Sequence, residues 1–179
     1  ETDVIPTTDR PKTYPAYFNG VASVLVDMQG LDGSTRVTDT VLAELQRADL
    51  VIWTIRANRP AREVDRASIV QFYQFCEDQP TRRMPPMIFA IPCIDEILRD
   101  WPLPENFLTD EAMFQVTKVV AAVAGEFSQP SVHPIPVALT EPDWNVATLR
   151  ERVDCYVGEA LMTQRNRLRV ENQKTGLLN

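Results

Sequence analysis

Four short apolar runs, nearly continuous rather than alternating, constrain the fold of this chain more than any other feature. Strands covered on both faces in a parallel sheet show this pattern, whereas strands with one solvent-exposed face alternate apolar and polar residues. Segments of helical period separate the runs, so the sequence predicts a three-layer, doubly wound α/β fold with a mostly parallel sheet. The runs are ASVLVDM (22–28), DLVIWTI (49–55), PMIFAIPC (86–93) and VHPIPVAL (132–139).

Further elements fit this scheme. The segment KTYPAYF (12–18) alternates weakly and contains Pro15, which favours an edge strand over a central one. Apolar residues recur with helical spacing from Val64, after Thr109 and from about Asn145. Each of these three segments is therefore predicted to be a helix, with Thr109 as an N-cap.

Length and composition limit the possible functions. With 179 residues, 44% of them hydrophobic, the chain can bury one sizeable core, and we expect an α/β domain over 1–158 and a C-terminal helical extension or tail over 159–179. No apolar run approaches the roughly 18 residues of a membrane span, and no signal pattern opens the chain, so we expect a cytoplasmic protein without a transmembrane segment. The net charge of −7 argues against a broad nucleic-acid surface.

Few residues here are suited to metal or thiol chemistry. The three cysteines, Cys76, Cys93 and Cys155, form no C-x-x-C pair, and we expect them to be buried and reduced. The single histidine, His133, lies between apolar residues and is expected to be structural.

Polar residues follow three of the predicted strands at their carboxyl ends, where doubly wound sheets bind ligands. Asp27 and Gly30 follow the first strong strand, Asp95 follows the next-to-last one, and Ala138-Leu139-Thr140 follows the last. Asp27 has a simpler interpretation as a residue that caps the next turn. The alternative is that the three strand ends form one ligand-binding rim.

These strand ends resemble the later part of a P-loop GTPase domain of the Era-like, translation-factor superclass. The stretch RADLVIWTIRANRPAREVDRA (47–67) looks like a strand and loop of bacterial members, and the resemblance covers most of residues 5–157. It implies a Ras-like sheet in which a strand leading to the P-loop lies between the strands at 22–28 and 49–55. It also implies a switch that binds a guanine nucleotide with Mg²⁺ and hydrolyses GTP.

The resemblance implies a role for each matching residue. Asp27 would hold Mg²⁺ through a water, the Gly30 amide would meet the γ-phosphate, and Thr8 (or Thr7) would be the switch threonine whose hydroxyl reaches the metal. Asp95 would accept two hydrogen bonds from the guanine ring, and the Ala138 amide would face the guanine carbonyl.

The sequence also departs from the GTPase pattern. Met28 and Gln29 interrupt the switch motif, while Pro92 and Cys93 replace the polar residue and the lysine of the base-reading motif. No G-x-x-x-x-G-K-[ST] occurs in these residues, so we do not expect this chain alone to hydrolyse GTP. We expect that the first strand and P-loop lie upstream in a longer protein, or that the domain is degenerate.

Two alternatives remain open. One is a non-catalytic GTPase-like scaffold with a protein partner at the switch face, for which Trp101 and Trp144 in proline-flanked loops are candidate contacts. The other is an isochorismatase-like cysteine hydrolase, because VLVDMQ resembles the opening strand of that family. Asp27 would then assist a nucleophilic cysteine, for which Cys93 is the candidate.

Overall fold

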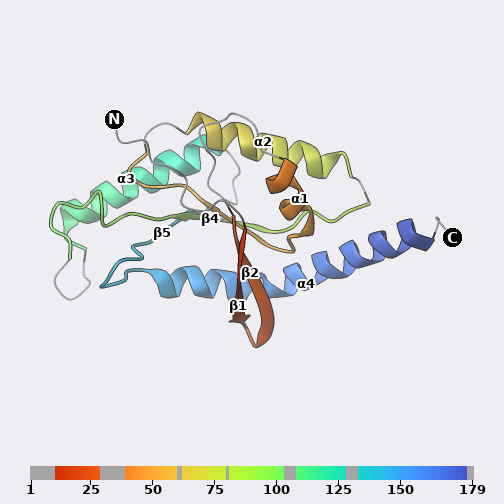
Figure 1. Cartoon of the computed structure of the whole chain (residues 1–179). Helices are drawn as coiled ribbons and strands as arrows, with labels where there is room; N and C mark the ends of the chain where they lie inside the picture. The colour runs from red at the N-terminus through yellow and green to blue at the C-terminus, as the bar shows by residue number, and fades with distance from the viewer. Residues whose placement is uncertain are drawn as a thin grey trace. The chain divides into compact units, whose positions relative to one another are not determined.

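The computed structural model describes residues 11–28, 39–59, 62–79, 81–102, 108–127 and 133–176. Helices and strands both occur, which confirms the α/β class (Figure 1). The chain divides into two compact units. The second unit comprises Val51–Arg62 and Met87–Cys155, and the first unit comprises the remaining residues. In chain order, the elements are β1 (Lys12–Phe18), β2 (Val21–Asp27), α1 (Asp39–Arg47), β3 (Val51–Thr54), α2 (Glu63–Glu77), β4 (Met87–Ile91), α3 (Asp110–Glu126), β5 (Ile135–Pro136) and α4 (Val146–Gly176).

In the first unit, β1 and β2 form an antiparallel hairpin with a two-residue turn. Phe18 and Val21 are the paired residues that flank this turn. Between them, Asn19 and Gly20 have φ values of 45° and 75°. A type I′ turn requires positive φ at both positions, and asparagine and glycine adopt it at the lowest cost. Both strands agree with the sequence-based prediction of where strands lie.

The environment of β2 differs from the prediction. The apolar run predicts a buried, central strand of the parallel sheet, but among the described strands β2 pairs only with β1. Val24 is 68% exposed, and Leu25 and Val26 are exposed as well. Asp27 therefore ends an exposed strand and not a buried one. The prediction was wrong because an apolar pattern reports what a strand can bury and not whether a partner covers it.

The second unit contains the parallel sheet that the sequence predicts, with strand order β3-β4-β5. In the central strand β4, residues 88–91 are buried. Phe89 of β4 stacks on Phe127, which caps α3, with ring centroids 5.5 Å apart. Because aromatic pairs bury a large apolar area, this contact holds α3 against the sheet.

Helix α3 begins at the predicted residue. The Thr109 hydroxyl accepts a hydrogen bond from the Ala112 N–H at 3.2 Å, which satisfies a donor that the helix itself cannot pair. On the predicted apolar stripe, Val116 and Val123 are buried, whereas Met113 is half exposed. The sequence thus predicts the start of the helix and most of its buried face.

The other helices agree with the prediction in part. Helices α2 and α4 begin within one residue of the predicted positions, at Glu63 and Val146. Helix α1 is missed by the sequence pattern, because nine residues are too few for a clear helical period. Helix α4 continues without a break through the boundary predicted between residues 158 and 159.

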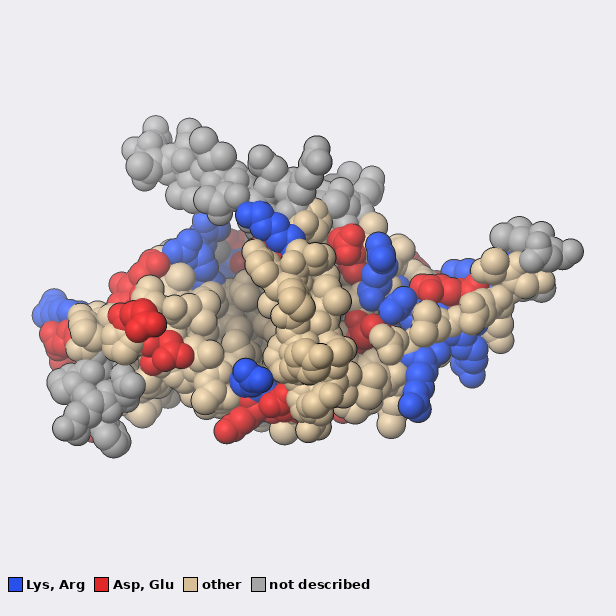
Figure 2. Space-filling view, turned by 60° about the horizontal axis from the view of Figure 1, so that its bottom comes forward, with Lys and Arg blue, Asp and Glu red and all other residues tan. Residues whose placement is uncertain are grey.

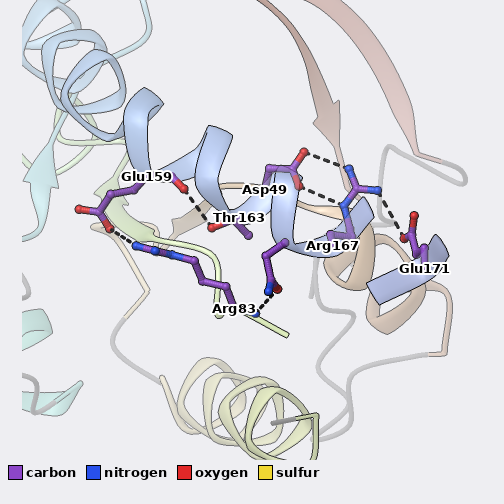
Figure 3. A network of polar contacts seen from close by, with 7 residues as sticks. Asp49, Arg83, Glu159, Thr163, Arg167 and Glu171 are labelled. Carbon is purple, nitrogen blue, oxygen red and sulfur yellow. Dashed lines mark hydrogen bonds and ion pairs between the residues drawn. The ribbon is translucent and has the colours of Figure 1, made fainter. Parts of the chain in front are cut away.

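A polar network ties α4 to the rest of the first unit (Figure 3). The Nε and Nη2 groups of Arg167 donate to the two carboxylate oxygens of Asp49, at 3.0 and 3.1 Å. Arg167 Nη1 also lies 3.5 Å from Glu171 Oε1. The hydrogen bond to Asp49 raises the pKa of Arg167 above its ordinary value. Arg167, one of three arginines between residues 165 and 169, is therefore part of this polar network and not of an open cationic surface.

A second group of contacts in the same network holds the segment before β4. The Arg83 N–H donates to Asn166 Oδ1 at 2.6 Å, and Asn166 Nδ2 donates to the Thr81 carbonyl at 3.2 Å. Arg83 also pairs with Glu159 at 3.8 Å (Figure 3). Residues 81–83 are thus attached to α4 by side-chain and backbone bonds together.

Acidic and basic side chains are interspersed on the face that Figure 2 shows. All three cysteines are free, as expected, but Cys76 and Cys93 are only half-buried and Cys155 is exposed, so the prediction of burial was wrong for Cys155. Within the described residues, no helix combines the length and the apolarity needed to cross a membrane.

Candidate functional site

Polar residues of the second unit gather where β3, β4 and β5 end. Because the strands are parallel, their carboxyl ends meet at one edge of the sheet, and ligands of α/β proteins bind at such edges. We use the name strand-end edge for the following five residues. They are Arg56 and Asn58 after β3, Asp95 and Glu96 after β4, and Thr140 after β5.

Backbone hydrogen bonds that join the end of β4 and the loop after it to the residue that follows β5 position Asp95. The Val137 N–H donates to the Ile91 carbonyl at 2.9 Å, and the Ile94 N–H donates to the Val137 carbonyl at 3.3 Å. Ile94 is fully buried and anchors the loop. Asp95 follows it directly, so its carboxylate emerges at the strand-end edge with partial exposure.

The loops after β4 and β5 are linked through the Asp95 carboxylate. The Thr140 hydroxyl donates to Asp95 Oδ2 at 2.9 Å. No residue in the described ranges is recorded as donating to Asp95 Oδ1, and each carboxylate oxygen can accept two hydrogen bonds. The carboxylate is therefore held in one orientation while keeping acceptor capacity for a ligand.

The loops after β3 and β4 are linked through Glu96. Arg56 Nη2 lies 3.1 Å from Glu96 Oε1, and Asn58 Nδ2 donates to Glu96 Oε2. The Ala57 N–H donates to the Pro92 carbonyl at 2.9 Å, which keeps the two loops side by side. Arg56 and Glu96 are each 43% exposed, so this pair contributes about 0–1 kcal/mol of stability and serves mainly to set the loop geometry.

Cys93 lies in the same loop in an unusual backbone conformation. Its φ is 65°, a left-handed value that a residue with a side chain adopts at a cost of about 1–3 kcal/mol. Burial, and secondly a hydrogen bond with Glu96, raise the pKa of the Cys93 thiol. A raised pKa lowers the fraction of thiolate, which counts against Cys93 as an activated nucleophile.

Ala138 is buried, and its backbone already has partners. Its N–H donates to the Trp144 carbonyl at 3.1 Å, and the Trp144 N–H donates to the Ala138 carbonyl at 3.0 Å. A guanine carbonyl could reach the Ala138 amide only if this bond opened. The role predicted for Ala138 stays a prediction.

Of the residues predicted to bind the phosphate and the metal, Asp27 alone lies within the described ranges. Asp27 belongs to the first unit, where it pairs in register with Lys12. Thr7, Thr8 and Gly30 lie outside the described residues. In the described ranges, no three His, Cys, Asp or Glu side chains are close enough together to hold a metal ion. Mg²⁺ usually takes one or two protein carboxylates together with substrate phosphates, and of the two residues predicted to hold it, Asp27 and Thr8, Asp27 alone lies within the described ranges.

Sequence reasoning identified Asp95 but missed Arg56, Asn58 and Glu96. In the sequence, only their positions could have indicated these three residues as part of a site, since each lies within five residues after the end of a strand. Thr140 stands in the turn singled out in the sequence, although its bond to Asp95 could not be read from the pattern. A side-chain bond across 45 residues depends on strand order, which the sequence predicts only in outline.

Comparison with known proteins adds no relative. A scan against protein-family models, a search of curated proteins and a search of solved structures each gave no match.

Proposed function

We propose that this chain is a GTPase-like α/β domain that binds a guanine nucleotide at the strand-end edge, with Asp95 as the residue that reads the base. The observation that carries the proposal is the Thr140–Asp95 hydrogen bond at 2.9 Å. It holds a partly exposed carboxylate at the carboxyl edge of a parallel sheet. Guanine presents two adjacent N–H donors to such a carboxylate, whereas adenine does not, and an unpaired carboxylate would be costly to desolvate.

The pairing of the strands supports the same class. The described strands fall into an antiparallel pair, β1-β2, and a parallel set, β3-β4-β5. The GTPase resemblance places the strand that leads to the P-loop between β2 and β3 in the sheet. Among the described strands, β2 and β3 belong to different sheets and do not pair with each other, as the resemblance also implies.

The proposal for this chain is nucleotide binding without efficient hydrolysis. Pro92 and Cys93 stand where the resemblance requires a polar residue and a lysine, and these residues contain no phosphate-binding loop. GTP hydrolysis, with Mg²⁺ near Asp27 and Thr8, is proposed only for a protein that also supplies such a loop. Without phosphate contacts, we expect weak binding, with a Kd of roughly 0.1–1 mM for the base and ribose.

Titration of ¹⁵N-labelled protein with guanosine, GTP and adenosine tests the proposal by nuclear magnetic resonance. Guanosine and GTP are expected to shift the amide signals around Asp95 and Thr140, and adenosine is not. Asp95→Asn should weaken guanosine binding about tenfold or more. The same variant should improve xanthosine binding, because xanthine carries a carbonyl where guanine carries its amino group.

Asp100→Asn is the matched control, since Asp100 is an exposed carboxylate further along the same segment. It should leave guanosine binding unchanged. Equal binding of guanosine and adenosine, or no binding of either, would contradict the proposal.

A non-catalytic scaffold is the second candidate, and the backbone of Ala138 favours it. Its amide is bonded to Trp144 and is not free for a guanine carbonyl. A scaffold would show no shift with any nucleoside, so the same titration separates the two functions.

A further inference from the structure

The hairpin of the first unit exposes apolar side chains on both of its faces. Tyr17 and Val24 lie on one face and are 67% and 68% exposed, while Tyr14 and Leu25 lie on the other and are nearly half exposed. The centre of Figure 2, in which the bottom of Figure 1 comes forward, is coloured mainly tan, which marks residues other than Lys, Arg, Asp and Glu. A two-stranded sheet is only marginally stable in water, whereas three or more strands with an apolar face are stable.

The two edges of the hairpin differ in what they can bind. In a two-residue hairpin the flanking pair, here Phe18 and Val21, is hydrogen-bonded, so bonded pairs alternate along the strands from there. The N–H and C=O groups of Ala22, Val24 and Val26 therefore point away from β1. No backbone hydrogen bond from the described residues to these three is recorded. They have no charged side chain and no proline, which are the usual means of protecting an edge strand.

We propose that the outer edge of β2 binds the same edge of a second copy of this chain, giving an antiparallel β2–β2 pair centred on Val24. This arrangement is self-complementary, because Val24 faces Val24 of the second copy and Ala22 faces Val26 in both directions. Every outward backbone group of these residues then exchanges hydrogen bonds with its counterpart. The inference does not rest on nucleotide binding, and it concerns this chain without the strand that the GTPase resemblance would place at the same edge of β2.

The charges on the strand permit this pairing. Asp27 is the only ionisable residue of β2, and in the proposed register it faces Val21 of the second copy and not another carboxylate. The joined hairpins form a four-stranded sheet with apolar side chains on both faces, which meets the requirement for a stable sheet.

A charge-swap experiment on the full chain tests the pairing. In sedimentation velocity over a range of concentrations, the wild type is expected to dimerise. Val24→Lys and Val24→Glu each place two like charges opposite one another and should weaken self-association about tenfold or more. An equimolar mixture of the two variants should form dimers again, because the opposed residues then carry opposite charges.

Val70 on α2 is a half-exposed valine of the same unit, and Val70→Lys is the matched control that should leave dimerisation unchanged. Far-UV circular dichroism confirms that each variant folds. Should the Val24 variants fail to fold, hydrogen exchange of the wild type decides. The amides of Ala22, Val24 and Val26 should be protected at high concentration and should lose this protection on dilution.

A monomeric wild type at all concentrations would overturn the proposal. Dimers of Val24→Lys as strong as those of the wild type, or a mixture that stays monomeric, would overturn it as well.

Discussion

At the scale of single residues, the Arg167–Asp49 pair is the best-formed ion pair among the described residues. Both side chains are largely buried, and two parallel hydrogen bonds join them. We expect Arg167→Ala to lower the free energy of unfolding by about 1–2 kcal/mol, between the values for exposed and buried pairs. Urea denaturation followed by circular dichroism measures this change.

Arg165→Ala is the control for that prediction, because Arg165 is exposed on the same helix and has no recorded partner among the described residues. It should change stability by less than about 0.5 kcal/mol. If both variants lose the same stability, the effect comes from the helix and not from the Asp49 contact.

The cysteines give a second prediction for single residues. Burial raises the pKa of the Cys76 thiol and of the Cys93 thiol, so at about pH 8 less of each is thiolate than in an ordinary cysteine. Iodoacetamide should therefore modify the exposed Cys155 first. The rates at Cys76 and Cys93 should be several-fold lower and should continue to rise above about pH 9.

Peptide mass spectrometry after timed quenching measures the three rates. Fastest modification at Cys93 would mean an activated thiol, and it would favour the cysteine hydrolase over the GTPase-like domain.

At the scale of elements, the start of α3 depends on one side chain. Thr109→Ala removes the acceptor for the Ala112 N–H and should lower the free energy of unfolding by about 1 kcal/mol. Thr117→Ala, at an exposed position within the same helix, should have no such effect or a slightly stabilising one, because alanine is the better helix former. Equal losses from the two variants, measured by thermal unfolding, would argue against the cap.

The strands and most helices could be predicted from sequence because their signals are local. Apolar runs indicated β3 and β4, and Thr109 indicated the start of α3. The exposure of β2 could not be predicted in this way, since it depends on which strands pair with it. The sequence of α1 gives too short a period to be recognised.

The residues of the candidate site could likewise be predicted from sequence only where their signal is local. Asp95 could be found from its place after a strand, as could the turn that contains Thr140. The bonds of Glu96 to Arg56 and Asn58 could not, because they join residues about 40 positions apart and depend on how the loops fold.

At the scale of the whole molecule, tryptophan fluorescence follows the unfolding of the second unit alone, whereas far-UV circular dichroism follows both units. All three tryptophans, Trp53, Trp101 and Trp144, belong to the second unit, whereas both units contain helices. Helix α4 begins in the second unit and ends in the first, so we expect the units to unfold together. Tryptophan fluorescence and far-UV circular dichroism should then give the same urea midpoint, and Arg167→Ala should shift both. Separate midpoints would show that each unit unfolds independently.

Pro15 in β1 limits the size of any assembly built on the hairpin. It is paired in register with Val24, so its backbone nitrogen, which has no hydrogen to donate, faces the outer side of β1. A third copy that added to the outer edge of β1 would therefore lack one backbone hydrogen-bond donor, at Pro15. Assembly through β2 accordingly stops at two chains, because any further growth into a filament would have to proceed through the outer edges of β1, where Pro15 cannot donate a hydrogen bond.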